Sequence, residues 1–257
     1  EIVPWLHLLS LNQDCKIFQD KTVLEIVEEV FAKYDQADYE IKCVGSYGPR
    51  EYCVQYRESD LNFVSRLLEG EGIFYFFQHT EEGHKLILAD DRSAVDKCEG
   101  QDEFLVATTP DSWADQDVIT EIEREFQIYT NAVTLTDYDP LQPSMNLEAS
   151  ASDESHEEVY DYPGKYTEVS SGEHYATLVL ERQAAGYEVV RGLSRCRAFR
   201  SGYTFDLSEH YRMDTNQTYL LRSVWHSAHG GGFRSTEQET EDSNQFEALP
   251  SSVTFRP

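Results

Sequence analysis

The chain has 257 residues, and its 48 acidic against 21 basic residues give a formal net charge of -27 at pH 7. A surface this acidic repels nucleic acid and anionic lipid, so the charge argues against a protein that binds either. Aromatic residues make up 12% of the chain, which is typical of a folded protein and not of an acidic disordered tail.

Cysteine usage and hydropathy limit the cellular setting. The five cysteines are odd in number and never form a C-x-x-C pair, so they indicate neither a disulfide framework nor a zinc knuckle, but thiols in a reducing cytoplasm. Since no apolar run is long enough to cross a membrane, we expect no membrane-spanning segment. The N-terminus also lacks the pattern of a cleaved signal peptide.

The first thirty residues predict strand-like runs followed by a helix. Apolar residues of the opening "EIVPWLHLLSLNQDCKIFQD" are grouped as in strands. The next segment, "KTVLEIVEEVFAKY", repeats its apolar residues at the spacing of one helix face. Thr22 and Glu25 have the spacing of a capping box, which predicts that the helix begins there.

The stretch "YCVQYRESDLNFVSRLLEGEGIFYFF" gathers four polar residues before a second predicted helix. Ser59 is expected to be its N-cap, and Asp60 places negative charge at the positive end of the helix dipole. Arg57 and Glu58 are expected to pair with neighbours at the helix entrance, so we favour a structural role over an active site. After Gly70 and Gly72, a strand over 73–77 and the following "KLILADD" predict a hairpin.

From about Val118 onward the pattern is mostly that of strands. The acidic segment "NLEASASDESHEEV" (146–159) is predicted to be an exposed loop or linker. One further helix is expected from Gly172 to about Ala185, with Tyr175, Leu178 and Val179 on its inner face. The whole predicts a strand-rich α+β chain with three helices and two sheet systems, parted near residues 90–117.

Motifs of known chemistry give little support for catalysis. The sequence contains no G-x-S-x-G elbow, phosphate-binding glycine loop or H-E-x-x-H pair. His226 and His229, with His210 upstream, do not predict a metal site, because an odd separation places the first two on opposite faces of a strand. An acidic pair for glycoside or cell-wall hydrolysis carries little information among 48 carboxylates. We therefore predict no catalytic residue, no metal and no cofactor.

Four stretches resemble one protein family, in the family's order. The segment 50–77 resembles the signature segment of VgrG proteins, the valine-glycine repeat spike of the bacterial type VI secretion system. "VYDYPGKY" (159–166) is similar to the family's Tyr-Asp-Tyr-Pro-Gly motif, and the closing "FRP" is similar to the end of its hub domain. The segment 4–31 resembles the preceding strand and helix of the family.

The resemblance implies a structural protein similar to the baseplate hub of contractile phage tails. It implies a strand-rich α+β fold with two β-barrel-type subdomains and a few helices, in a homotrimer that docks on the hexameric Hcp tube. A PAAR-repeat tip protein and effectors are implied partners through C-terminal parts not in this sequence. Assembly is expected in the bacterial cytoplasm, followed by secretion without a signal peptide. The alternatives are a phage or prophage contractile-tail hub and, less favoured, an acidic-pair hydrolase.

The resemblance also implies a domain division. Residues 1–117 would form the first hub subdomain, an incomplete barrel with a helix-helix-hairpin insertion. Residues 118–257 would form the second barrel and end just before an absent oligosaccharide/oligonucleotide-binding-type barrel. Family members carry a longer segment before Pro4, so we expect the missing first strands to come from that segment or from a second chain.

Two groups of residues are candidates for structure or assembly. Arg57, Glu58, Asp60 and Arg66, beside the cap Ser59, are expected to form buried or interprotomer ion pairs, although pairing on the helix surface is slightly favoured. The second group is a turn in which proline fixes one dihedral and glycine frees the next, either orienting the linker between barrels or forming an ordinary surface turn. Its residues are Tyr160, Asp161, Tyr162, Pro163 and Gly164.

Overall fold

The computed structural model describes residues 2–107, 117–152, 157–229 and 241–257. The chain divides into two compact units, each discontinuous in sequence. Unit 1 comprises residues 1–94, 131–182 and 255–257, and unit 2 comprises residues 95–130 and 183–254. The predicted division into hub subdomains is a single cut in the sequence between residues 117 and 118. It does not describe these compact units, and it stays a prediction.

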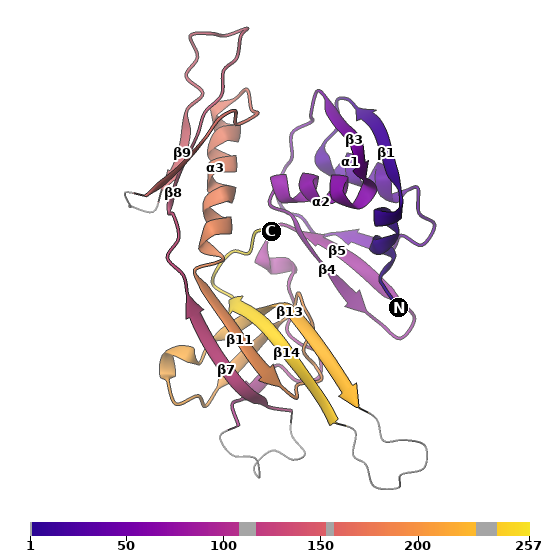
Figure 1. Ribbon diagram of the computed structural model, residues 1–257, viewed down its shortest axis with the longest axis vertical. Coiled ribbons are helices and arrows are strands. Elements are labelled where there is room, and N and C mark those ends of the chain that lie inside the picture. The colour runs from indigo at the N-terminus through magenta and orange to yellow at the C-terminus, as the bar shows by residue number, and fades with distance from the viewer. Residues whose placement is uncertain (1, 108–116, 153–156, 230–240) are drawn as a thin grey trace. The chain divides into compact units, whose positions relative to one another are not determined.

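The N-terminal segment of unit 1 contains two small sheets and two α-helices (Figure 1). Strand β1 pairs antiparallel with β3, and the second sheet has the order β2-β5-β4. The elements are η1 (Trp5–Leu11), β1 (Gln13–Phe18), α1 (Val23–Phe31), β2 (Tyr39–Ile41), β3 (Cys53–Ser59), α2 (Asp60–Gly70), β4 (Phe74–His79), β5 (His84–Ala89) and η2 (Arg92–Ala94).

Both helices of this segment begin where local sequence chemistry predicts. Thr22 and Glu25 form the capping box of α1, with each side chain bonded to the other residue's backbone N–H. The Ser59 hydroxyl accepts the N–H of Asn62 and caps α2. The apolar stripes of both helices are buried in one core with η1 and β3. The predicted hairpin is also confirmed, as β4 pairs antiparallel with β5.

The opening residues differ from the sequence prediction. Trp5 to Leu11 form a 3-10 helix, and the strand begins only at Gln13. Within that helix Trp5, Leu6 and Leu9 are buried. Residues spaced by three and four positions share one face of a helix, whereas in a strand Leu6 would point to the face opposite Trp5 and Leu9. Burial of all three therefore favours the helical form.

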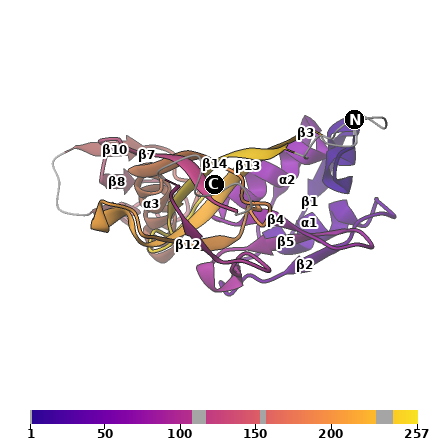
Figure 2. The ribbon, with the colours of Figure 1, turned by 90° about the horizontal axis from the view of Figure 1, so that it is seen from below.

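The second segment of unit 1 is a three-stranded sheet covered by α3 (Figure 1, Figure 2). The strand order is β10-β8-β9, with β10 parallel and β9 antiparallel to β8. Val133, Leu135, Leu147 and Ala149 contact Tyr166 and Ala176 in the core beneath the helix. The elements are β8 (Ala132–Leu135), β9 (Ala149–Ser152), β10 (Glu158–Asp161) and α3 (Val169–Ala184).

The prediction of an exposed loop over residues 146–159 was wrong at both of its ends. The buried residues Leu147 and Ala149 lead into β9, and β10 begins at Glu158. Alanine and serine carry a weak hydrophobic signal, but a small side chain suffices at a position covered by a helix. The middle of this segment, residues 153–156, lies outside the described part of the chain. Helix α3 is confirmed and begins three residues before the predicted start.

Unit 2 is built on one six-stranded sheet of order β6-β12-β13-β14-β11-β7. A parallel bridge between Val106 and Ile119 links the ends of the outer strands, so the sheet curls toward a closed barrel. Its interior is aromatic and includes Phe104, Phe199 and Phe205 in mutual ring contact. The elements are β6 (Glu103–Leu105), β7 (Ile119–Phe126), β11 (Glu188–Ser194), β12 (Thr204–Ser208), η4 (Met213–Thr215), β13 (Thr218–His229) and β14 (Glu241–Pro250).

Within the described ranges, no helix is both long enough and apolar enough to cross a bilayer.

Candidate assembly site

The first candidate group surrounds the start of α2, where the Asp60 carboxylate is completely buried. We call Asp60 and its partners the Asp60 cluster. Asn12 and Gln55 donate amide hydrogen bonds to the carboxylate at 2.8 and 2.7 Å, and the Tyr34 hydroxyl donates a third at 2.8 Å. The Lys33 ammonium lies 3.3 Å from both carboxylate oxygens. One buried charge therefore joins η1, α1, β3 and α2.

The electrostatics of this cluster follow from burial and hydrogen bonding. Burial alone would raise the pKa of Asp60, but hydrogen bonds from Gln55, Asn12 and Tyr34 and the charge of Lys33 outweigh it and lower that pKa. Burial and the adjacent carboxylate raise the pKa of the Tyr34 hydroxyl, so it stays protonated and donates. The arrangement stabilises the ionised form of Asp60, as expected of a structural centre.

Glu58 and Arg66 form an ion pair beside this cluster. The Arg66 guanidinium donates from Nε and Nη2 to the Glu58 carboxylate at 2.6 to 3.1 Å. Its Nη2 also donates to the carbonyl oxygen of Val54 at 2.7 Å. Within this chain the pair links the end of β3 to α2. An interprotomer role for these residues stays a prediction.

Arg57 occupies a β-bulge and does not join that pair. The register of β1 and β3 shifts opposite Asp14 and Cys15, which leaves Arg57 as the extra residue with φ of +52°. Its carbonyl accepts a 2.8 Å hydrogen bond from the Gln13 amide, and its guanidinium lies 5.3 Å from the Tyr56 ring centroid. The structure thus brings Glu58 and Arg66 together, whereas Arg57 is the extra residue of the bulge in β3.

A second site lies at the other end of α2 and is centred on Arg256. The second candidate group, the turn of residues 160–164, contributes to this site, as described below. The Arg256 guanidinium pairs with Glu181 of α3 at 2.6 Å and donates to the carbonyl oxygens of Gly72 and Asp90 at 3.0 and 2.5 Å. Its side chain is only 15% exposed. The preceding Phe255 ring contacts Phe74 of β4 edge to face. The C-terminal residues therefore connect α3 to the turn between α2 and β4.

Gly72 is required at this junction for two reasons. Its φ is +69°, a conformation that glycine adopts without a steric penalty. A Cβ atom added here would also lie 2.6 Å from Leu178 of α3 and 3.1 Å from the Cδ of Arg256. The absent side chain lets α3 approach the turn closely.

The Tyr-Asp-Tyr-Pro-Gly turn reaches the same place. A cavity of about 240 Å³ is lined by Gly70 and Gly72, by Pro163 and Gly164, and by Arg256, among other residues of unit 1. Each set comes from a different stretch on which the family resemblance rests. We name this place the motif junction. Three distant sequence motifs thus build one three-dimensional feature.

The turn differs in detail from its prediction. Positive φ occurs at Lys165, at 60°, and not at Gly164. Gly164 is needed for space, because a Cβ there would lie 2.3 Å from the buried Tyr166 ring. Proline does occupy the predicted position, after a cis Tyr162–Pro163 peptide bond. The proposed role of this turn in orienting a linker between barrels stays a prediction.

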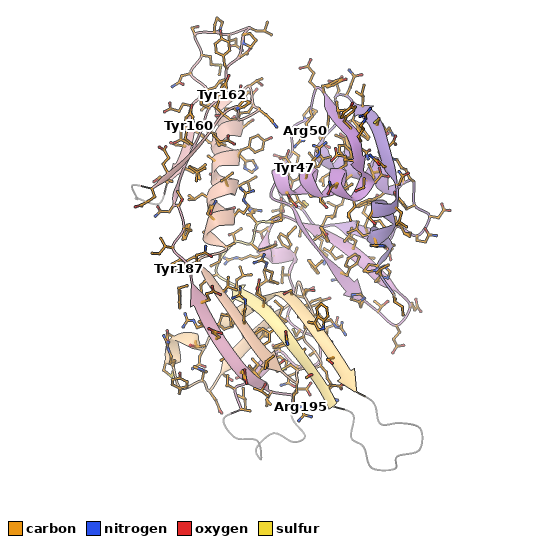
Figure 3. All side chains as sticks on the ribbon, in the orientation of Figure 1. Tyr47, Arg50, Tyr160, Tyr162, Tyr187 and Arg195 are labelled. Atoms are coloured by element: carbon orange, nitrogen blue, oxygen red, sulfur yellow. The ribbon has the colours of Figure 1, made fainter. Side chains whose placement is uncertain are left out.

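The two tyrosines of the turn do not point into the junction. Tyr160 and Tyr162 are both exposed and project from the β10 end of the three-stranded sheet (Figure 3). Asp161 holds the turn locally, since its carboxylate accepts the Tyr162 N–H at 2.8 Å and its carbonyl accepts the Thr136 N–H. These side chains are available at the surface, while the backbone shapes the junction.

Sequence reasoning did not identify Gly72 as a packing residue or Arg256 as a central contact. The available signal was the "FRP" motif itself, whose arginine is one of only 21 basic residues in an acidic chain. As for metal chemistry, the described ranges hold no group of three His, Cys, Asp or Glu side chains placed to bind an ion. His226 instead lies 3.0 Å from the carbonyl oxygen of Phe199.

Comparison with known proteins identifies the family. A family model described as phage tail baseplate hub (GPD) matches residues 1–232. The type VI secretion system spike protein VgrG1c of Pseudomonas aeruginosa is 34% identical over 96% of this chain. The chain covers 36% of that relative, about a third of its length.

Solved structures show the same fold. A component of the type VI secretion system, the E. coli c3393 protein, aligns with 99% of this chain and 56% of its own, with a TM-score of 0.68 and 19% identity. The 43 kDa tail protein of prophage MuSo2 from Shewanella oneidensis aligns with 96% of this chain and 73% of its own, with a TM-score of 0.65 and 10% identity. Together with the family match, these findings show that the chain belongs to the phage tail baseplate hub family.

Proposed function

We propose that this chain is the hub part of a type VI secretion spike, and that it works by assembly and not by catalysis. Three copies would form the hub ring, and one face of the ring would dock on the hexameric Hcp tube. Identity of 34% to a spike protein along almost the whole chain supports this role. The observation that carries the proposal is the motif junction, because the motifs shared with spike proteins meet at one packed site.

The finer features of the proposal concern parts that a longer protein would supply. A PAAR-repeat tip protein and effectors would bind through C-terminal parts. The hub would assemble in the bacterial cytoplasm and leave with the spike, without a signal peptide. The hub division at residues 117 and 118, and completion of the first barrel by other strands, belong to the same proposal.

Charge sets a condition on this assembly. Three chains of net charge -27 repel one another, so the trimer must bury enough apolar surface to overcome the repulsion or keep its carboxylates away from the contacts. At 0.1 M ionic strength, salt screens most of the repulsion between exposed charges that lie more than about 10 Å apart. Assembly of the trimer should therefore strengthen as salt is added.

The decisive measurement is the mass in solution by light scattering, for this chain and for a version extended through the spike needle. A trimer of the extended version that co-sediments with Hcp tubes would support the proposal. An extended version that stays monomeric at all salt concentrations would refute it. If only the extended version forms trimers, the assembly energy lies mainly in the needle, and the hub acts as an adaptor.

A second candidate is a phage or prophage tail hub, which the shared fold with the MuSo2 tail protein favours. Complementation separates the two: a secretion hub restores Hcp release in a strain lacking its spike protein, whereas a phage hub does not. That the chain has no enzymatic activity is also a proposal. Hydrolysis of cell-wall polymer that disappears in a single carboxylate variant would contradict it.

A further inference from the structure

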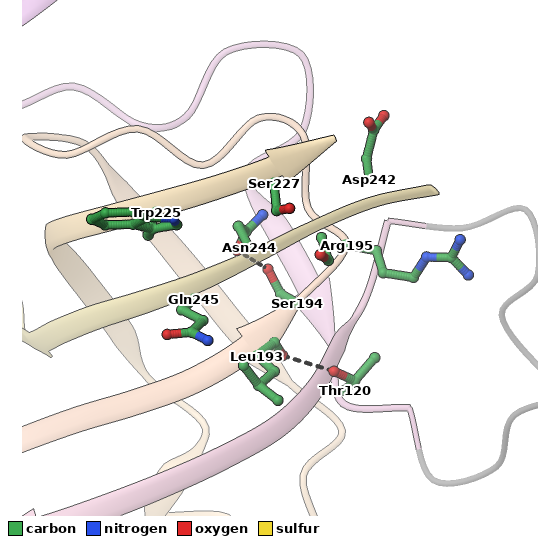
Figure 4. A pocket seen from close by; sticks show the side chains of 10 residues that line it. Thr120, Leu193, Ser194, Arg195, Trp225, Ser227, Asp242, Asn244 and Gln245 are labelled. Carbon is green, nitrogen blue, oxygen red and sulfur yellow. Dashed lines mark hydrogen bonds between the residues drawn. The ribbon is translucent and has the colours of Figure 1, made fainter. Parts of the chain in front are cut away.

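A groove of about 690 Å³ lies on the outer face of the unit 2 sheet, beside the exposed Trp225 of β13 (Figure 4). The charges around it do not select a partner. Arg191 of β11 is already paired with Glu125 of β7 and Glu247 of β14. A contact with more definite chemistry lies in unit 1, where a histidine side chain binds the start of η1.

The imidazole of His84, the first residue of β5, accepts a hydrogen bond from the backbone N–H of Trp5. The backbone nitrogen and the imidazole Nε2 are 2.9 Å apart. Because a backbone N–H can only donate, Nε2 must present its lone pair. His84 is therefore neutral in this contact, and its ring proton is on Nδ1.

This bond replaces a cap that η1 lacks. The N–H groups at the start of a helix have no partner within it, and the N-cap residue Pro4 provides no side-chain hydrogen bond. A side chain 79 positions away therefore supplies the cap. The Trp5 indole N–H donates to the carbonyl oxygen of Asp38 at 3.1 Å, and its ring contacts Phe31 of α1 edge to face. The cap thus fixes a residue that connects η1 to α1 and to the β4–β5 hairpin.

Proton uptake by His84 would remove this cap. A second ring proton turns Nε2 from an acceptor into a donor, so that two N–H groups would face each other. A released imidazole takes up a proton at about pH 6.5, the ordinary value for histidine. Proton binding and the cap therefore exclude each other. The cap is stable above this pH and is lost as pH falls through it.

The charged neighbours of His84 do not compensate for the lost bond. His79 is paired with it across the hairpin, with ring centroids 6.1 Å apart, so two protonated rings would repel each other. Lys85 of β5 pairs with Glu40 of β2. Within the described ranges no carboxylate forms an ion pair with His84. The other acidic and basic side chains around this contact are exposed, namely His7 of η1, Asp38, and Glu81 and Glu82 of the β4–β5 turn.

We propose that His84 is a pH-sensitive latch for the start of η1. At neutral pH the uncharged imidazole caps the helix and holds Trp5 against the hairpin. At lower pH protonation opens the first turn of η1, whereas Leu9, which is completely buried, keeps the end of the helix in the core. The exposed residues Ile2 and Val3 then enter unit 1 without a fixed attachment. This inference does not depend on the proposed spike-hub function.

Nuclear magnetic resonance on this chain tests the latch in two ways. The ring nitrogen shifts of His84 report its tautomer: at neutral pH the proton is expected on Nδ1, and a proton on Nε2 would overturn the inference. Exchange of the Trp5 amide reports the opening. Corrected for the intrinsic pH dependence of exchange, its protection should fall about tenfold from about pH 7.5 to about pH 5.5, as one proton taken up only by the open state requires.

Two variants separate the latch from a general loss of stability in acid. In His84→Gln the amide oxygen can accept the Trp5 N–H but does not titrate, so protection of Trp5 should not depend on pH. His79→Gln, on the paired strand, is the matched control and should show a fall of similar size to the wild type. Amides of α2 are the internal reference and should stay unchanged over this range. A wild-type Trp5 amide whose protection is independent of pH, or an equal fall in His84→Gln, would contradict the latch.

Discussion

Replacement of Asp60 by asparagine tests whether the buried carboxylate holds the first helices of unit 1 together. The substitution keeps the size of the side chain but replaces one acceptor oxygen by an NH₂ donor. That donor would face the groups that now donate to Asp60, namely Asn12, Tyr34 and the Lys33 ammonium. The variant therefore loses at least one charge-assisted hydrogen bond and leaves Lys33 without its buried partner.

The expected cost follows from these contacts. Hydrogen bonds to charged groups contribute about 1.5–3 kcal/mol each, and breaking a buried ion pair costs about 3–5 kcal/mol. The oxygen that accepts from Gln55 can be retained, so we expect Asp60→Asn to cost about 3 kcal/mol, or roughly a 150-fold larger opening equilibrium. The loss should concentrate in α1, α2 and β3, which the cluster connects.

The stabilisation by Asp60 should depend on pH, and the direction of its lowered pKa sets the sign of that dependence. Since the folded-state pKa of Asp60 is lowered, its stabilisation is fully present above the unfolded-state value of about 3.9 and is lost as pH falls through the folded-state pKa. The free energy of opening should be higher for the wild type than for Asp60→Asn, by a constant difference from pH 7 down to about pH 4. Below that range the difference should shrink.

Native-state hydrogen exchange is the appropriate assay, because it measures the free energy of opening at individual amides of α1 and α2. Glu58→Gln is the matched control: it also removes a carboxylate near the start of α2, but its partner Arg66 is 45% exposed. The control should cost about 1 kcal/mol, less than Asp60→Asn, because water reaches the half-exposed Arg66 guanidinium even though the Glu58 side chain is only 17% exposed. Equal effects of the two variants, or a difference unchanged at low pH, would refute the assignment of Asp60 as a buried structural charge.

Three further predictions concern the junction and assembly. Gly72→Ala should lower the free energy of unfolding of unit 1 by about 2 kcal/mol, measured by thermal or urea unfolding, because the residue has a positive φ and its added Cβ would lie 2.6 Å from Leu178. Gly83→Ala is the control and should be close to neutral, because no atom lies within 4 Å of its added Cβ. Arg256→Lys cannot contact Glu181 and two carbonyls in the same planar geometry, so α3 should lose exchange protection by roughly tenfold or more, and unchanged protection would show that the guanidinium is dispensable. The trimer fraction measured by light scattering should rise with sodium chloride, and a fall would show that attractive charge pairs dominate the interface.

Local features of the fold were predictable from local chemistry. The capping box at Thr22 and Glu25, the N-cap at Ser59 and the hairpin of β4 and β5 each depend on residues close together in sequence. The predictions that failed depend on distant partners. Strand β9 is poor in hydrophobic residues and exists because β8 and α3 lie beside it.

Candidate sites were predictable only in part, for the same reason. Ser59 and Glu58 have the roles expected near a helix start, but the complete burial of Asp60 depends on η1 and α1. The positive φ of Arg57 has no counterpart in residue preferences, because arginine rarely occupies that region. The function of Arg256 depends on residues that are far from it along the chain, and no local pattern reports such a contact.

The contacts of the motif junction can form only late in the synthesis and folding of the protein. Arg256 binds the carbonyl of Gly72 across 184 positions and that of Asp90 across 166. When the ribosome has made the first 94 residues, α1 and α2 can form, but α3 and the C-terminal residues that connect it to the turn after α2 do not yet exist. Contacts of such long sequence separation form late and slowly. Unit 1 is therefore completed by almost the last residues of this sequence, so an interrupted chain cannot present a finished unit to its partners.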